Sequence, residues 1–226
     1  NGVIIVMFIL VIYTGFTSDN FFTKNNFMNI LMNMSSRLVI ALGIAGCVIT
    51  AGCDLSAGRM IGFGACISGM LLQRMDYSGK FFPDMQPLNV FVVALIAMLV
   101  CAAFGTVTGF FIAYLNVPPF IATLAMMEIV YGIGLIVTNA TPLGGYVEQY
   151  TNVSNGKFLG INYLIWIAII VAAITWFIFN MTRHGKYMYA IGGNPQAAEV
   201  AGVPVKATLI LIYMKAAAMY GLAGFM

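Results

Sequence analysis

Charged side chains are scarce in this chain. Asp, Glu, Lys and Arg make up 8% of its 226 residues, whereas they form about a quarter of a soluble globular protein. Ten Lys and Arg with seven Asp and Glu are too few to cover the surface of a water-soluble domain of this length. The basic residues form no extended stripe, and the net charge is only +3. The composition therefore excludes a cytosolic enzyme and a nucleic-acid-binding protein.

Motifs for metal binding, nucleotide binding and nucleophilic catalysis are also missing. The one histidine, His184, lies in a basic segment that we expect to be a loop, and the chain has neither an HExxH nor a GxSxG pattern. No Gly-Lys pair has the upstream glycine and the following Ser or Thr of a Walker A motif. The four cysteines lie inside apolar runs without a CxxC pair, which is typical of small packing residues. The sequence predicts no metal site, no bound cofactor and no catalytic residue.

Long apolar runs dominate instead, and apolar residues make up 62% of the chain. A helix needs about 20 mostly apolar residues to cross a bilayer. We therefore predict an all-α, polytopic transmembrane helix bundle with about seven hydrophobic passes, some of them short enough to be broken or tilted. These passes are Val3 to Phe16, Leu38 to Gly52, Ser56 to Leu72, Val90 to Leu115, Phe120 to Thr138, Ile161 to Phe179 and Ala207 to Met226.

The chain begins and ends abruptly. Asn1-Gly2 directly precedes an apolar run without an initiator Met, and Met226 ends inside another run. We expect residues 1–226 to form a single transmembrane domain that is truncated at both ends.

The segments between the passes are polar. Thr17 to Ser36 holds five asparagines among apolar residues at helical spacing, which predicts an amphipathic helix at the membrane interface. Gln73 to Asn89 and Asn139 to Gly160 are expected to be loops, because they are rich in charge, proline, glycine or asparagine. Asn116-Val117-Pro118-Pro119 predicts a tight turn.

A carboxylate, Asp54, and a hydroxyl, Ser56, lie between two passes, where Gly52 and Gly58 permit a break in the helix. Two interpretations are open. A broken helix can line a polar cavity, because ionisable groups at membrane depth usually face water or protein. Alternatively, the segment is a short re-entrant turn in which Asp54 caps the next helix by accepting hydrogen bonds from N–H groups near Ala57 and Gly58.

Glu128 and Lys215 each interrupt an otherwise apolar pass. A charged side chain in such a position either lines a polar pathway or extends its long stem toward the membrane interface. The sequence leaves both possibilities open.

A capped helix is predicted between the last two passes. Asn194 is a favourable N-cap, Pro195 suits the first helical position, Gly202 provides a C-terminal stop, and Pro204 prevents continuation. Its small residues would form a close-packing surface for a partner, the alternative being an ordinary structured loop. These residues are Ala197, Ala198 and Ala201.

Three motifs resemble the permease subunits of bacterial ABC sugar importers, in the ribose, xylose and galactose branch, and most closely its methyl-galactoside permeases. They are Gly52-x-Asp54-Leu55-Ser56-x-Gly58, the segment Ala113 to Leu124 around the tight turn, and the segment from Thr182-Arg183-x-Gly185-Lys186 to Gly193-Asn194-Pro195-x-Ala197-Ala198 and Gly202. The chain departs from the family at Tyr213-Met214-Lys215-Ala216, where a Ser-Gly pair is usual.

The resemblance implies a permease of the bacterial inner membrane that works with three kinds of partner. A second copy of the permease would complete the pore, two cytoplasmic ATPases would use ATP, and a periplasmic binding protein would deliver a monosaccharide such as galactose or a methyl-galactoside. Asp54, Ser56 and Glu128 are then expected along the translocation pathway. The capped helix becomes the coupling helix that contacts the ATPase, with Gly185, Gly193, Asn194, Pro195, Ala197, Ala198 and Gly202 as its residues.

The overall distribution of charge does not determine how the chain is oriented in the membrane, because Lys and Arg are divided almost equally between the segments expected on its two sides. The local group of Arg183, His184 and Lys186 at the end of a pass favours a cytoplasmic position for residues 180–206, in agreement with the resemblance. A secondary transporter is the main alternative, since broken helices and membrane acids also suit ion coupling. An intramembrane enzyme using Asp54 or Glu128 is disfavoured, because no nucleophile motif accompanies them.

Overall fold

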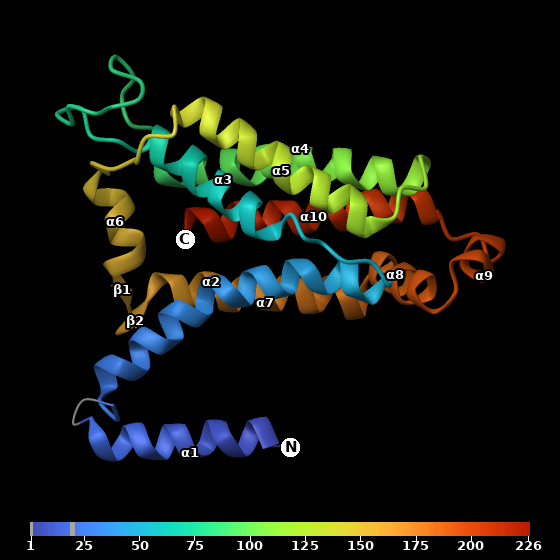
Figure 1. Ribbon diagram of the computed structural model, residues 1–226, viewed down its shortest axis with the longest axis horizontal. Helices are drawn as coiled ribbons and strands as arrows, with labels where there is room; N and C mark the ends of the chain where they lie inside the picture. Colours follow the sequence, from blue (N-terminus) through green and yellow to red (C-terminus); the bar gives the residue numbers. More distant parts are fainter. Residues whose placement is uncertain (1, 19–20) are drawn as a thin grey trace.

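The computed structural model describes residues 2–18 and 21–226, so Asn1, Asp19 and Asn20 lie outside the described residues. The described chain is almost entirely helical (Figure 1). Its elements in order are α1 (Gly2–Thr17), α2 (Lys24–Ile49), α3 (Ala57–Leu71), α4 (Val90–Tyr114), α5 (Pro119–Thr138), α6 (Glu148–Asn155), β1 (Lys157–Phe158), β2 (Ile161–Asn162), α7 (Tyr163–Met181), α8 (Arg183–Gly193), α9 (Pro195–Val200) and α10 (Val205–Phe225).

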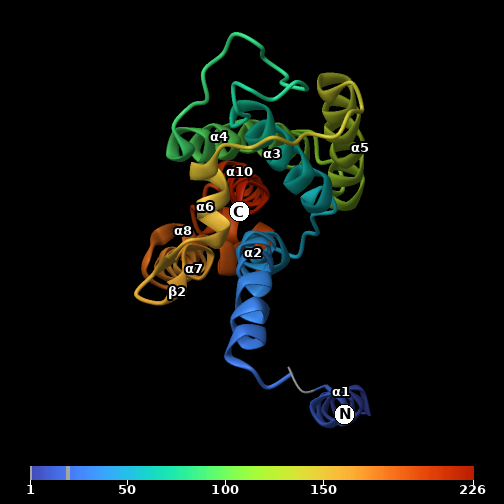
Figure 2. The same ribbon diagram turned by 90° about the vertical axis from the view of Figure 1, so that its left-hand side faces the viewer.

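The predicted transmembrane bundle is confirmed. Helices α2, α4, α5, α7 and α10 are long and apolar enough to span a membrane, and α1 and α3 are shorter apolar helices. These seven helices correspond to the seven predicted passes. Helix α1 lies apart from the other helices and has no buried residue (Figures 1 and 2).

Helix α10 is the centre of the bundle and packs against α4, α3 and α2 (Figure 2). Its Tyr213, Ala216, Ala217 and Tyr220 are each at most 1% exposed. Gly105 of α4 lies against Tyr213 and Ala217 so closely that a methyl group there would overlap them. The two tyrosine side chains fit inside the core because glycines lie beside them, Gly43 of α2 against the Tyr220 ring and Gly52 against the Tyr213 hydroxyl.

Two groups of short elements close the ends of the bundle. The α9 end carries α8, α9 and the start of α10, whereas the α6 end carries α6, the antiparallel β1–β2 pair and the loop 73–89 (Figure 1). Gln73 is only 1% exposed, and its side chain holds that loop in place by two hydrogen bonds. Its amide donates to the Gly144 carbonyl oxygen at 3.0 Å and accepts from the Phe81 N–H at 2.7 Å.

Three of the expectations for the connecting segments are wrong. The described part of Thr17 to Ser36, which leaves out Asp19 and Asn20, holds no separate interface helix, because α2 begins at Lys24, behind an N-cap at Thr23, and continues unbroken to Ile49. The segment 139–160 contains α6 and β1 instead of a pure loop. His184 lies in α8 instead of a loop, since Thr182 caps that helix by accepting the Gly185 N–H. The tight turn before Pro119 and the loop 73–89 are confirmed.

Candidate functional site

The break between α2 and α3 contains the predicted polar residues. Helix α2 closes with Ala51 in the left-handed region, at φ 57°, where its N–H donates to the Val48 carbonyl oxygen. The Gly52 N–H then donates to the Cys47 carbonyl oxygen at 2.9 Å. This is the Schellman pattern of a helix end. Gly52 therefore lies in the break, whereas Gly58 lies one residue inside α3 and does not contribute to it.

Asp54 connects the break to the central helix. One carboxylate oxygen accepts from the Ser56 N–H at 3.0 Å and from the Ser56 hydroxyl at 2.6 Å. The other oxygen accepts from the Tyr220 hydroxyl of α10 at 3.0 Å. The Tyr213 hydroxyl donates more weakly, at 3.5 Å, to the Cys53 carbonyl oxygen. We call Asp54, Ser56 and Tyr220 the Asp54 network.

This geometry agrees with the short turn, but Asp54 does not cap α3 as that interpretation expected. The N–H that Asp54 accepts belongs to Ser56, not to a residue near Ala57 or Gly58, so that detail of the capping interpretation is wrong. Ser56 is only 3% exposed and faces protein. Helix α5 also holds the break, because the Thr123 hydroxyl oxygen accepts the Leu55 N–H at 3.2 Å. The break is thus fixed from two sides.

Glu128 lies outside the Asp54 network. It is exposed and occupies the tenth position of the twenty in α5. The structure therefore brings Asp54 and Ser56 together but leaves the third predicted pathway residue on an open face. Tyr220 was missed by sequence reasoning, because an aromatic residue in an apolar pass carries no signal of its hydrogen-bond partner.

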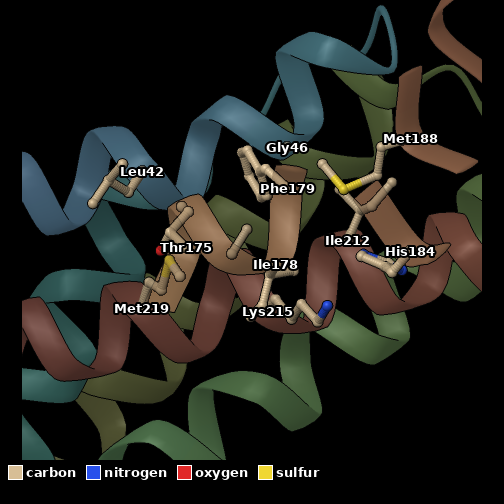
Figure 3. A pocket seen from close by; sticks show the side chains of 12 residues that line it. Leu42, Gly46, Thr175, Ile178, Phe179, His184, Met188, Ile212, Lys215 and Met219 are labelled. Carbon is tan, nitrogen blue, oxygen red and sulfur yellow. The ribbon is translucent and has the colours of Figure 1, made fainter. Parts of the chain in front are cut away.

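Lys215 and His184 border a pocket between α2, α7, α8 and α10 (Figure 3). Apolar residues such as Leu42, Phe179 and Met219 form most of its wall. The His184 Nε2 atom is buried without a hydrogen-bond partner. Burial lowers the pKa of His184 to about 4, with a further contribution from the Lys215 charge. Within the described residues no group of three or more His, Cys, Asp and Glu side chains is placed to hold a metal ion.

The predicted capped helix is present as α9. The Asn194 side-chain oxygen accepts the Ala197 N–H at 3.0 Å. Gly202 adopts φ 82°, and the Val203 N–H donates to the Ala198 carbonyl oxygen, which again is the Schellman pattern. Local chemistry alone therefore determines both ends of α9.

The exposed surface of α9 differs from the expected one. Ala198 is 4% exposed and packs inside, so it cannot belong to a docking surface. Ala197 and Ala201 are exposed, and Val200 is 91% exposed. Gly193 is exposed as well, with open space where a side chain would be.

Gly185 also differs from its expected role. It is buried in α8 against the end of α7, so close to the Phe179 backbone that no side chain would fit. Gly185 is therefore a packing residue of α8 and no part of the α9 surface.

Comparisons with known proteins identify the class. A helical bundle with five potential spans and a capped helix at one end fits a multi-pass membrane permease. The chain belongs to the family described as branched-chain amino acid transport system / permease component, whose model matches residues 26–226. The membrane location and the predicted permease family are thereby confirmed. No significant match to a solved structure is found.

Several proteins of similar sequence are sugar import permeases. The galactose/methyl galactoside import permease protein MglC of Escherichia coli K12 is 40% identical over 233 residues, which cover all of this chain and 69% of that protein. The protein of the same name from Haemophilus influenzae is 41% identical over 98% of this chain and 69% of its own length. The ribose import permease protein RbsC of Escherichia coli K12 is 31% identical over 98% of this chain and 66% of its own length.

Proposed function

We propose that the chain is the membrane permease subunit of an ABC importer that carries galactose, a methyl galactoside or a closely related monosaccharide. The similarity to the galactose/methyl galactoside import permeases along the whole chain carries this proposal, because that identity exceeds the 31% identity to the ribose permease. The protein would lie in the bacterial inner membrane, with the α9 end in the cytoplasm. It would act as a subunit without enzymatic activity and without a bound cofactor.

The partners follow from the same proposal. A second copy completes the pore, a cytoplasmic ATPase binds and hydrolyses ATP, and a periplasmic binding protein delivers the sugar. Helix α9 would be the coupling helix, through the exposed Val200 with Ala197 and Ala201. A coupling element acts only through contacts that differ between two states of the partner.

Helix α10 provides a path from this contact to the membrane interior. It follows α9 after only four residues, and its Tyr220 holds Asp54 at the break. We propose that movement of α9 reaches the break between α2 and α3 through α10. Asp54 would then act by positioning the break, whereas Glu128, on the open face of α5, would line the pathway.

Transport by the full-length protein tests the proposal. We expect proteoliposomes with the permease, its ATPase and a sugar-loaded binding protein to accumulate galactose only when ATP is supplied. An ATPase with a disabled Walker A motif is the matched control. Accumulation by the permease alone, driven by a proton or sodium gradient, would instead assign the protein to the secondary transporters.

A further inference from the structure

Two charged side chains lie at mid-depth on the outer faces of α3 and α5. Arg59 is the third residue of α3, and its guanidinium carbon lies 3.8 Å from the centroid of the Tyr131 ring on α5. Glu128 precedes Tyr131 by three residues, which places the two side chains as neighbours on the helix surface. Both α5 residues lie near the middle of a twenty-residue span, so the cation rests well inside the membrane.

Neither charge is neutralised within the described part of the chain. Arg59 makes no hydrogen bond or ion pair there beyond its contact with Tyr131, and Glu128 makes none. Both side chains are exposed. A charged group at the centre of a bilayer is costly unless it faces water or protein. This face of α3 and α5 therefore does not contact lipid.

A groove between the two helices opens beside these residues. Its volume is about 190 Å³, which is smaller than the sites that hold drug-sized ligands, roughly 300–1,000 Å³. Gly58 and Gly62 form part of its wall, and nothing lies within 4 Å of the position that a side chain would take at either glycine. Arg59, Tyr131 and Cys66 also border the groove. We call it the Arg59–Tyr131 groove.

We propose that the Arg59–Tyr131 groove binds the sugar inside the membrane during translocation, an inference that rests on the proposed function. The guanidinium lies over the Tyr131 ring and makes no hydrogen bond within the described residues, so its N–H donors are free to pair with sugar hydroxyls. Glu128 does not border the groove, but its carboxylate lies beside Tyr131 on the surface of α5. One cation and one anion leave this face without net charge, which favours a neutral polyol over an ion. Arg59 and Tyr131, which border the groove, are thus the sugar-contacting residues.

Substitutions in the assembled, full-length importer test the contacts. Arg59→Gln and Tyr131→Leu should each lower the maximal rate of sugar uptake by about tenfold or more, the effect of losing about 1.4 kcal/mol. Binding-protein-stimulated ATP hydrolysis should remain, because α9 and the Asp54 network are untouched. Tyr131→Phe keeps the ring beneath the guanidinium and should lower uptake less than Tyr131→Leu. Trp176→Leu, at an exposed aromatic on α7, is the matched control and should have no effect.

The outcomes separate the two proposals. An unaltered importer that fails to take up sugar with ATP would overturn the proposed function. Normal uptake by both Arg59→Gln and Tyr131→Leu, in an importer that otherwise works, would overturn only the groove. Equal loss of uptake and of ATP hydrolysis would also count against it, because that result indicates a structural role.

Cys66 gives an independent readout of what fills the groove. Cys47 and Cys101 are buried, so a Cys53→Ser background leaves Cys66 as the accessible thiol of this region. A membrane-impermeant, quaternary ammonium methanethiosulfonate should modify Cys66, and sugar-loaded binding protein with ATP should slow the reaction. The Cys66→Ser variant defines the signal that belongs to this thiol. Modification by a hydrophobic maleimide alone would show that the groove faces lipid, and would overturn the inference.

Discussion

Asp54 shows how a single carboxylate can hold an irregular segment at membrane depth. One of its oxygens accepts a hydrogen bond from the Ser56 hydroxyl within the break, and the other accepts one from the Tyr220 hydroxyl on α10. Broken helices are tolerated in a membrane only where protein or water satisfies the freed backbone groups. The bonds from Leu55 to Thr123 and from Tyr213 to Cys53 satisfy two of those groups.

Removal of one hydroxyl tests the Asp54 network. Tyr220→Phe leaves a carboxylate oxygen without its donor, and hydrogen bonds to charged groups contribute roughly 1.5–3 kcal/mol. We expect a lower thermal unfolding temperature in detergent and reduced sugar uptake. Tyr213→Phe is the control, since it removes only the 3.5 Å bond to Cys53 and should have a smaller effect. Asp54→Asn combined with Tyr220→Phe should cost less than the sum of the single changes. Strict additivity would show that the two side chains act separately.

His184 makes stability depend on pH in a defined window. Its pKa is about 4 in the folded chain, against an ordinary value of 6.5, because burial disfavours the charged ring and Lys215 repels it. Above pH 6.5 neither state binds the proton, so the full stability is present. Between pH 6.5 and 4 only the unfolded chain becomes protonated, and stability must decline as the pH falls. Unfolding midpoints measured across this range should decline less in His184→Gln, and an unchanged decline would assign the dependence to other groups.

At the scale of elements, α8 and α9 show how glycine has opposite effects in neighbouring helices. Gly202 ends α9 by adopting a positive φ, in agreement with its expected use. Gly185 and Gly192 instead lie inside or near the end of α8, where they permit close contact with the backbones of α7 and α2. Such packing outweighs the low helix propensity of glycine, and so the sequence did not reveal α8.

The exposed residue Val200 offers a direct test of α9 as the coupling helix. Val200→Glu replaces an apolar contact with a charge that must lose its water on docking, which is costly without a partner. We expect normal amounts of permease in the membrane, loss of ATPase co-purification and a fall in uptake of about tenfold or more. Val200→Ala is the matched control and should lose less. ATPase association and uptake equal to the unaltered protein in Val200→Glu would contradict the coupling assignment.

Ala198→Glu should fail in a different way. Its side chain is buried against the chain's own helices, so an added charge destabilises the permease itself. Lower amounts of protein in the membrane would separate this result from that of Val200→Glu.

At the scale of the whole molecule, α10 connects the parts that the proposed mechanism requires. It begins four residues after α9, crosses the centre of the bundle and contacts the break between α2 and α3 (Figure 1). The α9 end and the Asp54 network are thus linked by a single helix. The Arg59–Tyr131 groove lies between α3 and α5.

Several features of the protein could be predicted from the sequence by itself. Composition determined that the solvent is a bilayer, apolar runs determined the seven helices, and caps and prolines determined α9 and the turn before α5. These features depend on residues close together in the chain. Three motifs together indicated the permease family for the same reason, because each is a short local pattern.

Tertiary structure alone decided which polar side chains meet. Tyr220 reaches Asp54 across 166 residues of sequence, and Tyr131 lies over Arg59 on a different helix. The same packing buries Ala198 and exposes Val200. Helical periodicity places a residue on one face of its own helix but contains no information about which helix covers that face. Contacts between helices depend on how small residues allow the backbones to approach, and that is a property of the assembled bundle.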